Sequence, residues 1–267
     1  MTVQVRRYNQ REDARRGRRG VFINTTETYL HSMYELEEEE EEGAVPTRRA
    51  LQARLRVTRS AICQQVVRLE RDGLVELSAA DRIRLTEPGR AAAVRIIRKH
   101  RLVERLLVDI IGLDWELSHA EATRWQHVVS DAVERKLVMI LDAPEVSPFG
   151  NPIPGLDQLT SGPLGRPDDL RGTRPLIRLD DFARRGGGRA SIAQLFERIQ
   201  ADRVQLSRLR RAGVVPGGIV DVRPEGLDRV DIAARLETVV LDAAGARSVI
   251  VAPYDPQVAG HEVDRTG

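Results

Sequence analysis

Four of the five histidines in this sequence lie in segments whose apolar spacing predicts helices. His100 and Glu104 are four residues apart, so on a helix both side chains project from the same face. The other three are His31, His119 and His127. Imidazole and carboxylate groups together suit Fe(II), Mn(II), Co(II), Ni(II) or Zn(II) without choosing among them. The clustering indicates a metal centre, although a single His-x-x-x-Glu pair is also common as a surface interaction.

The composition fits a protein of two or three small domains, because the chain has 267 residues. No apolar run reaches the roughly 18 residues that a membrane span needs, and the N-terminal stretch lacks the apolar core of a secretory signal. The single cysteine, Cys63, excludes an internal disulfide and fits a reducing compartment. We therefore expect a cytoplasmic protein with no membrane partner.

The N-terminal region combines a basic arm with a helix. Residues 1–20 contain seven arginines and almost no apolar residues, which predicts a disordered arm that can contact DNA phosphates. From residue 24 onward, NTTETYLHSMYELEEEE places apolar residues at helical spacing. The glutamate run 37–42 is typical of a solvated helix end, and we assign it no chemistry.

The next part of the chain predicts a DNA-binding motif. Segments 47–57 and 58–73 have the pattern of two short amphipathic helices, and LVEL and RIRLT then form a two-stranded ribbon. Helices followed by such a ribbon make a winged helix-turn-helix, whose later helix enters the major groove. Side chains that can reach bases or phosphates gather at the start of that helix, which favours DNA binding over an ordinary hairpin: Thr58, Arg59, Ser60, Gln64 and Gln65.

The remaining segments predict a helical domain and a β-rich domain. Residues 87–141 are strongly helical and carry more apolar surface than a winged domain needs, which predicts a two-fold dimer suited to a palindromic operator. Residues 144–190 are rich in proline and glycine and predict loop and linker. Two apolar-periodic segments and the strands GGIVDVRP, ETVVLD and RSVIVAPY then predict a small β-rich barrel.

Several stretches resemble the diphtheria toxin repressor family of iron-dependent regulators: TTETYLHSMYELEEE, RLERDGLV, RKHRLVERLLVDIIGLD, RWQHVVSDAVERKL and SPFGNPIPGLD. The similarity runs from about residue 24 to residue 157 and continues weakly beyond. It implies a metal-activated transcriptional repressor rather than an enzyme. The implied fold is mainly α with β, and consists of an N-terminal winged helix-turn-helix, a helical dimerisation domain and a C-terminal small SH3-like β-barrel.

This resemblance also sets the expected domains and partners. The expected boundaries are 1–20 for the basic arm, 21–93 for the winged-helix domain, 94–157 for the helical dimerisation and metal-binding domain, 158–190 for a flexible linker, 191–256 for the SH3-like domain and 257–267 for a tail. The implied partners are a second copy of the chain and double-stranded DNA with a palindromic operator, which one or two dimers occupy.

The family has two metal sites, and the ancillary one is largely matched here. The resemblance implies His100, Glu104 and His119 as helical ligands, while a glutamate and a glutamine from the third domain align with Asp202 and Gln205. An anion held beside this site in some members would contact Arg101, Ser147 and Asn151. The expected ion is Fe(II) or Mn(II), and Co(II), Ni(II) or Zn(II) are expected to substitute in vitro.

The family's primary, activating site is degenerate in this chain. Its thioether, carboxylate or thiol positions hold Thr28, Thr123 and Gln126, and only His127 is retained. Neutral oxygens bring no negative charge to a divalent ion, so this set is expected to bind one poorly. His31, one turn from Thr28, is a possible replacement ligand that would share a metal, a haem or a small anion with His127.

The resemblance also implies DNA contacts. The base-reading or phosphate-contacting positions of the reading helix are Thr58, Ser60, Ala61 and Gln64, and the supporting phosphate contacts are Thr25, Arg48, Arg71 and Arg82. Ser60 replaces a proline of the family, so the preferred operator is expected to differ. Cys63 lies at this face, either as a redox switch or as a structural residue.

Three functions are compatible with these residues. The first is a dimeric repressor whose DNA affinity depends on Fe(II) or Mn(II) at the ancillary site. The second is a regulator of the same fold that is independent of metal or responds to another ligand near His31 and His127. The third, a metal-buffering protein or metallohydrolase, lacks support because no nucleophile–base pair, phosphate loop or zinc-protease spacing accompanies the cluster. We predict the first.

Overall fold

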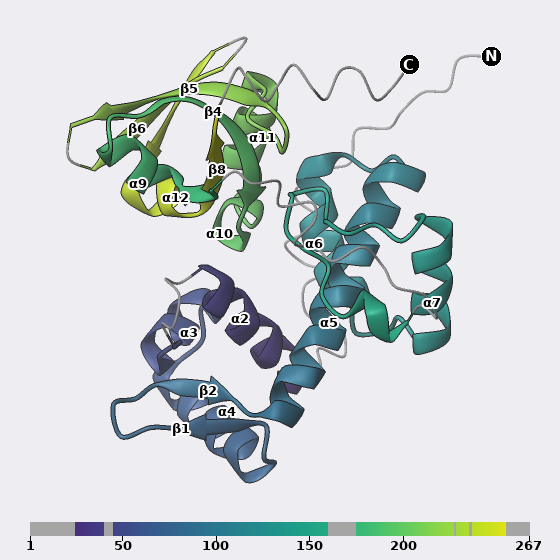
Figure 1. Ribbon diagram of the computed structural model, residues 1–267. Coiled ribbons are helices and arrows are strands. Elements are labelled where there is room, and N and C mark those ends of the chain that lie inside the picture. The colour runs from purple at the N-terminus through teal and green to yellow at the C-terminus, as the bar shows by residue number, and fades with distance from the viewer. Residues whose placement is uncertain (1–24, 40–44, 160–174, 227, 235–236, 255–267) are drawn as a thin grey trace, which may run out of the picture.

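The computed structural model describes residues 25–39, 45–159, 175–226, 228–234 and 237–254. These residues form three lobes: a winged-helix lobe, a helical lobe and a lobe built on a β-sheet, with the helix α10 of the sheet lobe facing the other two (Figure 1). The basic arm expected over 1–20 and the tail expected over 257–267 lie outside the described residues. None of the helices described is long and apolar enough to span a membrane.

The winged-helix lobe has the predicted order of three helices and a ribbon. Its elements are α2 (Thr25–Glu39), α3 (Arg48–Leu55), α4 (Arg59–Arg71) and the antiparallel pair β1 (Val75–Leu77) and β2 (Ile83–Leu85). Thr47 and Thr58 begin α3 and α4, because each side-chain oxygen accepts a hydrogen bond from a backbone N–H of the first turn. Leu30, Met33 and Leu51 are at most 1% exposed and fill the core. The predicted winged helix-turn-helix is confirmed.

The helical lobe consists of α5 (Glu87–Arg105), α6 (Trp115–Trp125) and α7 (Asp131–Ile140). The long helix expected from residue 87 ends as an α-helix at Arg105 and continues as a π-helical turn over Leu106–Ile110. Apolar residues of all three helices form one core with the loop that follows α7: Leu102, Val103, Leu107, Ala122, Leu137, Val138, Ile153 and Leu156.

The third lobe is a six-stranded antiparallel sheet with strand order β3-β8-β4-β5-β6-β7. Its strands are β3 (Ile177–Arg178), β4 (Gly188–Leu195), β5 (Ile219–Glu225), β6 (Arg229–Ala233), β7 (Thr238–Asp242) and β8 (Val249–Pro253). Its helices are α9 (Leu179–Arg184), α10 (Glu197–Gln200), α11 (Arg203–Ala212) and α12 (Ala243–Arg247). The β-rich third domain is thus present as an antiparallel sheet.

The expectation of a linker over residues 158–190 is wrong at its C-terminal end. Residues 177–178 form β3, which pairs with β8, and α9 buries Leu179 and Phe182 in the core of the sheet lobe. The glycines at 186–188 that suggested a linker have positive φ; Gly186 and Gly187 form the turn after α9, and Gly188 begins β4. Residues 160–174 of the expected linker lie outside the described residues.

A short loop of the helical lobe attaches the sheet lobe. Phe149 is fully buried among the residues of the sheet core, and its carbonyl accepts a hydrogen bond of 3.0 Å from Leu195 N. Gly150 has φ +81°, and a Cβ there would lie 2.0 Å from the carbonyl oxygen of Ala193. Only glycine allows this approach. The attachment places α10, directly after β4, beside the helical lobe (Figure 1).

Candidate metal centre

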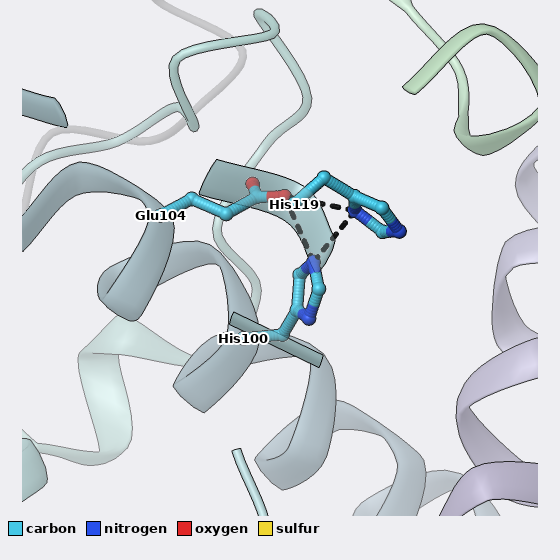
Figure 2. A group of neighbouring side chains, drawn as sticks. All are labelled: His100, Glu104 and His119. Carbon is cyan, nitrogen blue, oxygen red and sulfur yellow. Dashed lines mark hydrogen bonds and ion pairs between the residues drawn. The ribbon is translucent and has the colours of Figure 1, made fainter. Parts of the chain in front are cut away.

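Three buried side chains converge between α5 and α6. His100 and Glu104 lie one turn apart on α5, and His119 points toward them from α6 (Figure 2). His100 Nε2 is 2.8 Å from Glu104 Oε1 and 3.1 Å from His119 Nδ1, which in turn is 3.2 Å from Glu104 Oε1. Among the described residues, this is the group of histidine and acidic side chains whose donor atoms approach closely enough to share one ion.

The geometry of these donors fits a divalent transition ion. Ligands bound at roughly 2.1 Å and at right angles lie about 3 Å apart, and the three separations here are 2.8, 3.1 and 3.2 Å. Two imidazoles and one carboxylate are a ligand set suited to Fe(II) and its neighbours. The sequence predicted all three residues, and the structure brings them together.

The outward ring nitrogen of each histidine is also held. Nδ1 of His100 lies 2.9 Å from Oε1 of Gln126, and Nε2 of His119 forms an ion pair with Glu197. Such contacts fix the tautomer and orientation of a metal-binding histidine. Glu197 is the first residue of α10, so the sheet lobe contributes directly to the centre.

The carboxylates and histidines of the centre shift one another's pKa values in the absence of a metal ion. Burial opposes ionisation of Glu104, but the neighbouring His100 and His119 lower its pKa to about 2. The pKa of Glu197 is likewise lowered to about 2, because His119 outweighs the effect of burial. Burial also disfavours the charged form of His119, yet Glu197 and Glu104 raise the pKa of His119 well above its usual value. The two carboxylates therefore stay ionised and hold a proton on His119 that a metal ion would displace.

The structure does not bring Asp202 and Gln205 to this centre. Asp202 is the exposed N-cap of α11 and accepts hydrogen bonds from Val204 N and Gln205 N at 3.1 and 3.0 Å. The amide of Gln205 instead lies against Gly245 in the sheet lobe. Glu197 and Gln200 have the same spacing of three, and this pair follows β4, whose residues Ala190, Ile192 and Leu195 are buried. The two pairs have the same acid-x-x-glutamine pattern, so the sequence did not distinguish them.

The residues of the degenerate primary site bond to one another and to helices nearby. The Thr123 hydroxyl donates to the carbonyl of His119 at 2.9 Å, within its own helix. Nε2 of Gln126 lies 3.2 Å from Nε2 of His127, whose Nδ1 is 2.6 Å from Oε2 of Glu27 on α2. Thr28 lies half-buried in the same turn as Glu27. The contact of Glu27 with His127 was not expected from the sequence, because a glutamate in the first turn of a helix usually interacts with the helix dipole.

His31 does not lie with His127. Its ring packs edge-on against His100 with centroids 4.8 Å apart, and its Nε2 is 2.7 Å from Oε1 of Glu35. His127 pairs with Glu27 instead. The two histidines thus have different partners, because His31 projects from α2 toward α5 and the candidate metal centre, and their sharing of a ligand stays a prediction.

Among the residues of the expected anion site, Arg101 binds a carboxylate of the chain itself. Arg101 forms an ion pair with both carboxylate oxygens of Glu38, and its Nη1 lies 3.0 Å from Oε1. The same nitrogen donates a hydrogen bond to the carbonyl oxygen of Pro152. Ser147 Oγ accepts from Phe149 N at 3.1 Å, and Asn151 Nδ2 donates to Leu195 O at 3.0 Å. The three side chains thus bind other parts of the chain, and an anion beside the centre stays a prediction.

The first three residues of the glutamate run, which are the ones that the structure describes, were wrongly assigned to solvent. Glu37, Glu38 and Glu39 form ion pairs with Arg90, Arg101 and Arg54 respectively, which attach the end of α2 to the rest of the molecule. Burial raises the pKa of Glu39 to about 7, even though Arg54 opposes the shift. The last turn of α2 faces the junction of the lobes, and glutamates there meet arginines instead of water.

The residues expected to contact DNA lie on the surface of the winged-helix lobe. Thr25, Thr58, Ser60, Gln64, Arg71 and Arg82 are exposed, and Ala61 is half-buried at the start of α4. Thr58 caps α4 by accepting from Ala61 N at 3.2 Å. Arg48 is paired with Asp81 in the turn of the ribbon, so it also supports the wing. Half-buried Cys63 lies on α4 with its Sγ 4.0 Å from Arg48.

A winged-helix lobe joined to a helical lobe with a buried His/Glu centre defines a metal-dependent DNA-binding regulator. Two family models match the chain in that order: "Iron dependent repressor, N-terminal DNA binding domain" over residues 21–80, and "Iron dependent repressor, metal binding and dimerisation domain" over residues 86–155. The chain belongs to the iron-dependent repressor family, whose members are transcriptional repressors and not enzymes.

Relatives of known name agree with this assignment. The chain is 47% identical over 201 residues to the iron-dependent repressor IdeR of Mycobacterium tuberculosis, covering 75% of this chain and 84% of that protein. It is 43% identical over 201 residues to the diphtheria toxin repressor of Corynebacterium diphtheriae, covering 75% and 85%. A solved manganese-dependent transcriptional repressor in complex with manganese covers 86% of this chain and 100% of its own, with a TM-score of 0.69 and 27% identity.

Proposed function

We propose that this protein is a homodimeric repressor whose affinity for a palindromic operator is set by one Fe(II) or Mn(II) ion per chain, held by His100, Glu104 and His119. The observation that carries this proposal is the convergence of three buried donor atoms within 3.2 Å of one another. The degenerate site offers no comparable set, since Gln126 and His127 bond to each other. A bound divalent ion would supply positive charge among buried carboxylates.

The centre lies where all three lobes meet. His100 and Glu104 come from α5, His119 from α6, and Glu197 from α10 of the sheet lobe. The winged-helix lobe reaches the same place through His31, which packs on His100. Ligands that bind one arrangement of lobes more tightly than others increase its population. Ordering these side chains therefore favours one orientation of α2 and α4 for DNA.

Dimer formation is supported by exposed apolar side chains on the helical lobe. Val128, Met139 and Ile140 are 79%, 70% and 60% exposed. Apolar surface of this kind in a folded protein marks an interface, and the matched family model names dimerisation for this region. A two-fold dimer presents two copies of α4 to a palindromic operator, which one or two dimers occupy. Because its target is DNA, we place the protein in the cytoplasm.

A second function, repression without a metal signal, is favoured by one observation. Glu27 and His127 already connect α2 to the helical lobe through a bond of 2.6 Å that involves no ion. If this bond alone fixes α2, DNA affinity is independent of metal.

The test is binding of the metal-stripped protein to a palindromic DNA found by selection. Fe(II), Mn(II), Co(II) and Zn(II) are titrated at fixed salt, because phosphate contacts make affinity salt-dependent. We expect affinity to rise at least about tenfold, or about 1.4 kcal/mol, and both His100→Ala and the isosteric Glu104→Gln to abolish the rise. Glu121→Gln, on the outer face of α6, is the control. Specific binding that does not change with metal would overturn the proposal.

A further inference from the structure

A continuous run of hydrogen bonds joins the metal centre to the first turn of α2. His100 Nδ1 lies 2.9 Å from Gln126 Oε1, and Gln126 Nε2 lies 3.2 Å from His127 Nε2. His127 Nδ1 then lies 2.6 Å from Glu27 Oε2. Gln126 is 3% exposed and the side chain of His127 is 6% exposed, so water has little access to the middle of the run. The run crosses from the helical lobe to the winged-helix lobe.

The direction of every bond in this run follows from His100. Nε2 of His100 faces Glu104 and His119, so as a ligand it directs its lone pair there and carries its proton on Nδ1. That proton is donated to the amide oxygen of Gln126. The amide nitrogen of Gln126 donates to Nε2 of His127, which must then carry its own proton on Nδ1 and donate it to Glu27. Every donor meets an acceptor while both imidazoles are neutral.

The other neutral form of His100 breaks this pattern. If Nε2 carries the proton and donates it to Glu104, Nδ1 becomes an acceptor that faces the amide oxygen of Gln126, which is also an acceptor. Turning the amide over moves the conflict to His127, where Nε2 would then need a proton in addition to the one on Nδ1. A buried polar group without a partner is destabilising. With both imidazoles neutral, one bond of the run is therefore lost whenever Nε2 of His100 carries the proton, and ligation through Nε2 excludes that form.

We propose that Gln126 and His127 form a relay through which ligation by His100 strengthens the hydrogen bond between His127 and Glu27. This inference rests on the proposed function and names the residues that carry the signal to α2. Gln126 and His127 are positioning residues here, although they stand where the family's primary metal ligands were expected. The coupling is reciprocal, so docking of α2 through Glu27 also raises the metal affinity of the centre.

Nitrogen-15 NMR of the histidine rings tests the relay, with Zn(II) as a diamagnetic probe. The chain has five histidines, so the spectrum is simple, and His127→Gln assigns the signal of His127. We expect Zn(II) to shift the signals of both His100 and His127, and to move His127 to the form protonated on Nδ1. In Gln126→Met, the signal of His100 still responds and that of His127 does not.

The control for Gln126→Met is Gln158→Met. The side chain of Gln158 accepts a hydrogen bond of 3.2 Å from Arg98 in the same lobe and takes no part in the relay. Both histidine responses are expected to remain in this variant. It separates loss of the relay from a general effect of replacing a glutamine by methionine.

Hydrogen exchange of α2 provides a second readout. We expect Zn(II) to slow exchange in the first turns of α2 by about tenfold, within the usual range of coupling between sites, and Glu27→Ala to remove most of this effect. Glu27→Gln retains an oxygen that accepts from Nδ1 of His127, so it is expected to restore much of it. The Zn(II) affinity of Glu27→Ala falls by the same factor by which the protection falls.

The outcomes distinguish this inference from the function on which it rests. A response of His127 that survives in Gln126→Met means that His127 binds the metal itself, and overturns the relay. If Zn(II) shifts the signal of His100 but changes neither the signal of His127 nor hydrogen exchange in α2, the relay is also overturned. The proposed function then remains intact. Absence of any response at His100 overturns the proposed function.

Discussion

Each histidine of the metal centre has one ring nitrogen directed at the other ligands and the second nitrogen held by a different residue. Gln126 holds His100, and Glu197 holds His119. Because the two supports come from different lobes, a change in either one is felt at the ligands without altering the ligands themselves. The groups behind the ligands therefore determine how the centre is connected to the rest of the molecule.

Replacing the support of His119 tests this arrangement. Glu197→Gln removes the charge that fixes His119, and we expect Mn(II) affinity measured by calorimetry to fall by roughly 10- to 100-fold. Asp202→Asn is the matched control, because asparagine caps a helix as well as aspartate does and Asp202 only caps α11. Equal losses in the two variants would contradict the placement of Glu197 at the centre.

The sequence identified His100, Glu104 and His119, but it did not show which residues hold the outward ring nitrogens of the two histidines. Two acid-x-x-glutamine pairs begin five residues apart, at Glu197 and Asp202, and only the packing of α10 shows which of them faces the centre. Helical periodicity likewise does not reveal which members of a glutamate run meet arginines of another lobe. Contacts of this kind depend on tertiary packing that no local pattern encodes.

At the level of elements, the attachment of β4 to the helical lobe holds the sheet over the centre. Gly150→Ala would place a Cβ 2.0 Å from Ala193 O, on a residue with φ +81°. We expect this variant to lose the attachment and, with it, the contribution of Glu197, so that Mn(II) affinity falls as in Glu197→Gln. Faster hydrogen exchange in β4 measures the detachment directly.

Gly213→Ala is the control for this variant. Gly213 has φ +86° but no atom within 4 Å of an added Cβ, so only conformational strain of about 1 kcal/mol is expected. Its melting temperature should fall slightly while Mn(II) affinity stays unchanged. If Gly150→Ala behaves like Gly213→Ala, the loop does not position the sheet.

The elements themselves were predictable where their periodicity is long. The helices of the first two lobes followed from their apolar spacing, and the ribbon followed from its short alternating strands. The strands β3, β4 and β6 and the helix α9 were not predicted, because they lie beside glycine-rich or charged segments and, except for β4, have at most six residues. Short elements of this kind are stabilised by neighbouring strands, and their sequences carry little signal of their own.

For the whole molecule, buried charge at the junction of the lobes makes stability depend on pH. Burial raises the pKa of Glu39 to about 7, and Glu35 and Glu197 raise the pKa of His31 against the effect of burial. Both groups bind protons more tightly in the folded state than in the unfolded state. The free energy of unfolding therefore decreases as pH rises through the pKa values that the two groups have in the folded state. Glu104 and Glu197, with pKa values of about 2, lose their contribution only below about pH 4.5.

We therefore expect the melting temperature of the metal-stripped protein to fall between pH 5.5 and pH 8. Mn(II) displaces protons from the centre, so the increase in melting temperature that it causes should grow over the same range. Glu39→Gln, which cannot ionise, should show a smaller decline without metal. A metal-stripped protein that becomes more stable toward pH 8 would contradict these assignments of charge.

We expect one ion per chain, at His100, Glu104 and His119, to set DNA affinity. The most direct measurement counts the Mn(II) ions bound per chain by equilibrium dialysis and records operator binding on the same samples. We expect one ion per chain, operator affinity that rises in step with that ion, and neither effect in Glu104→Gln. Two ions per chain, with DNA affinity following the second, would show that the site at His127 is still the sensor.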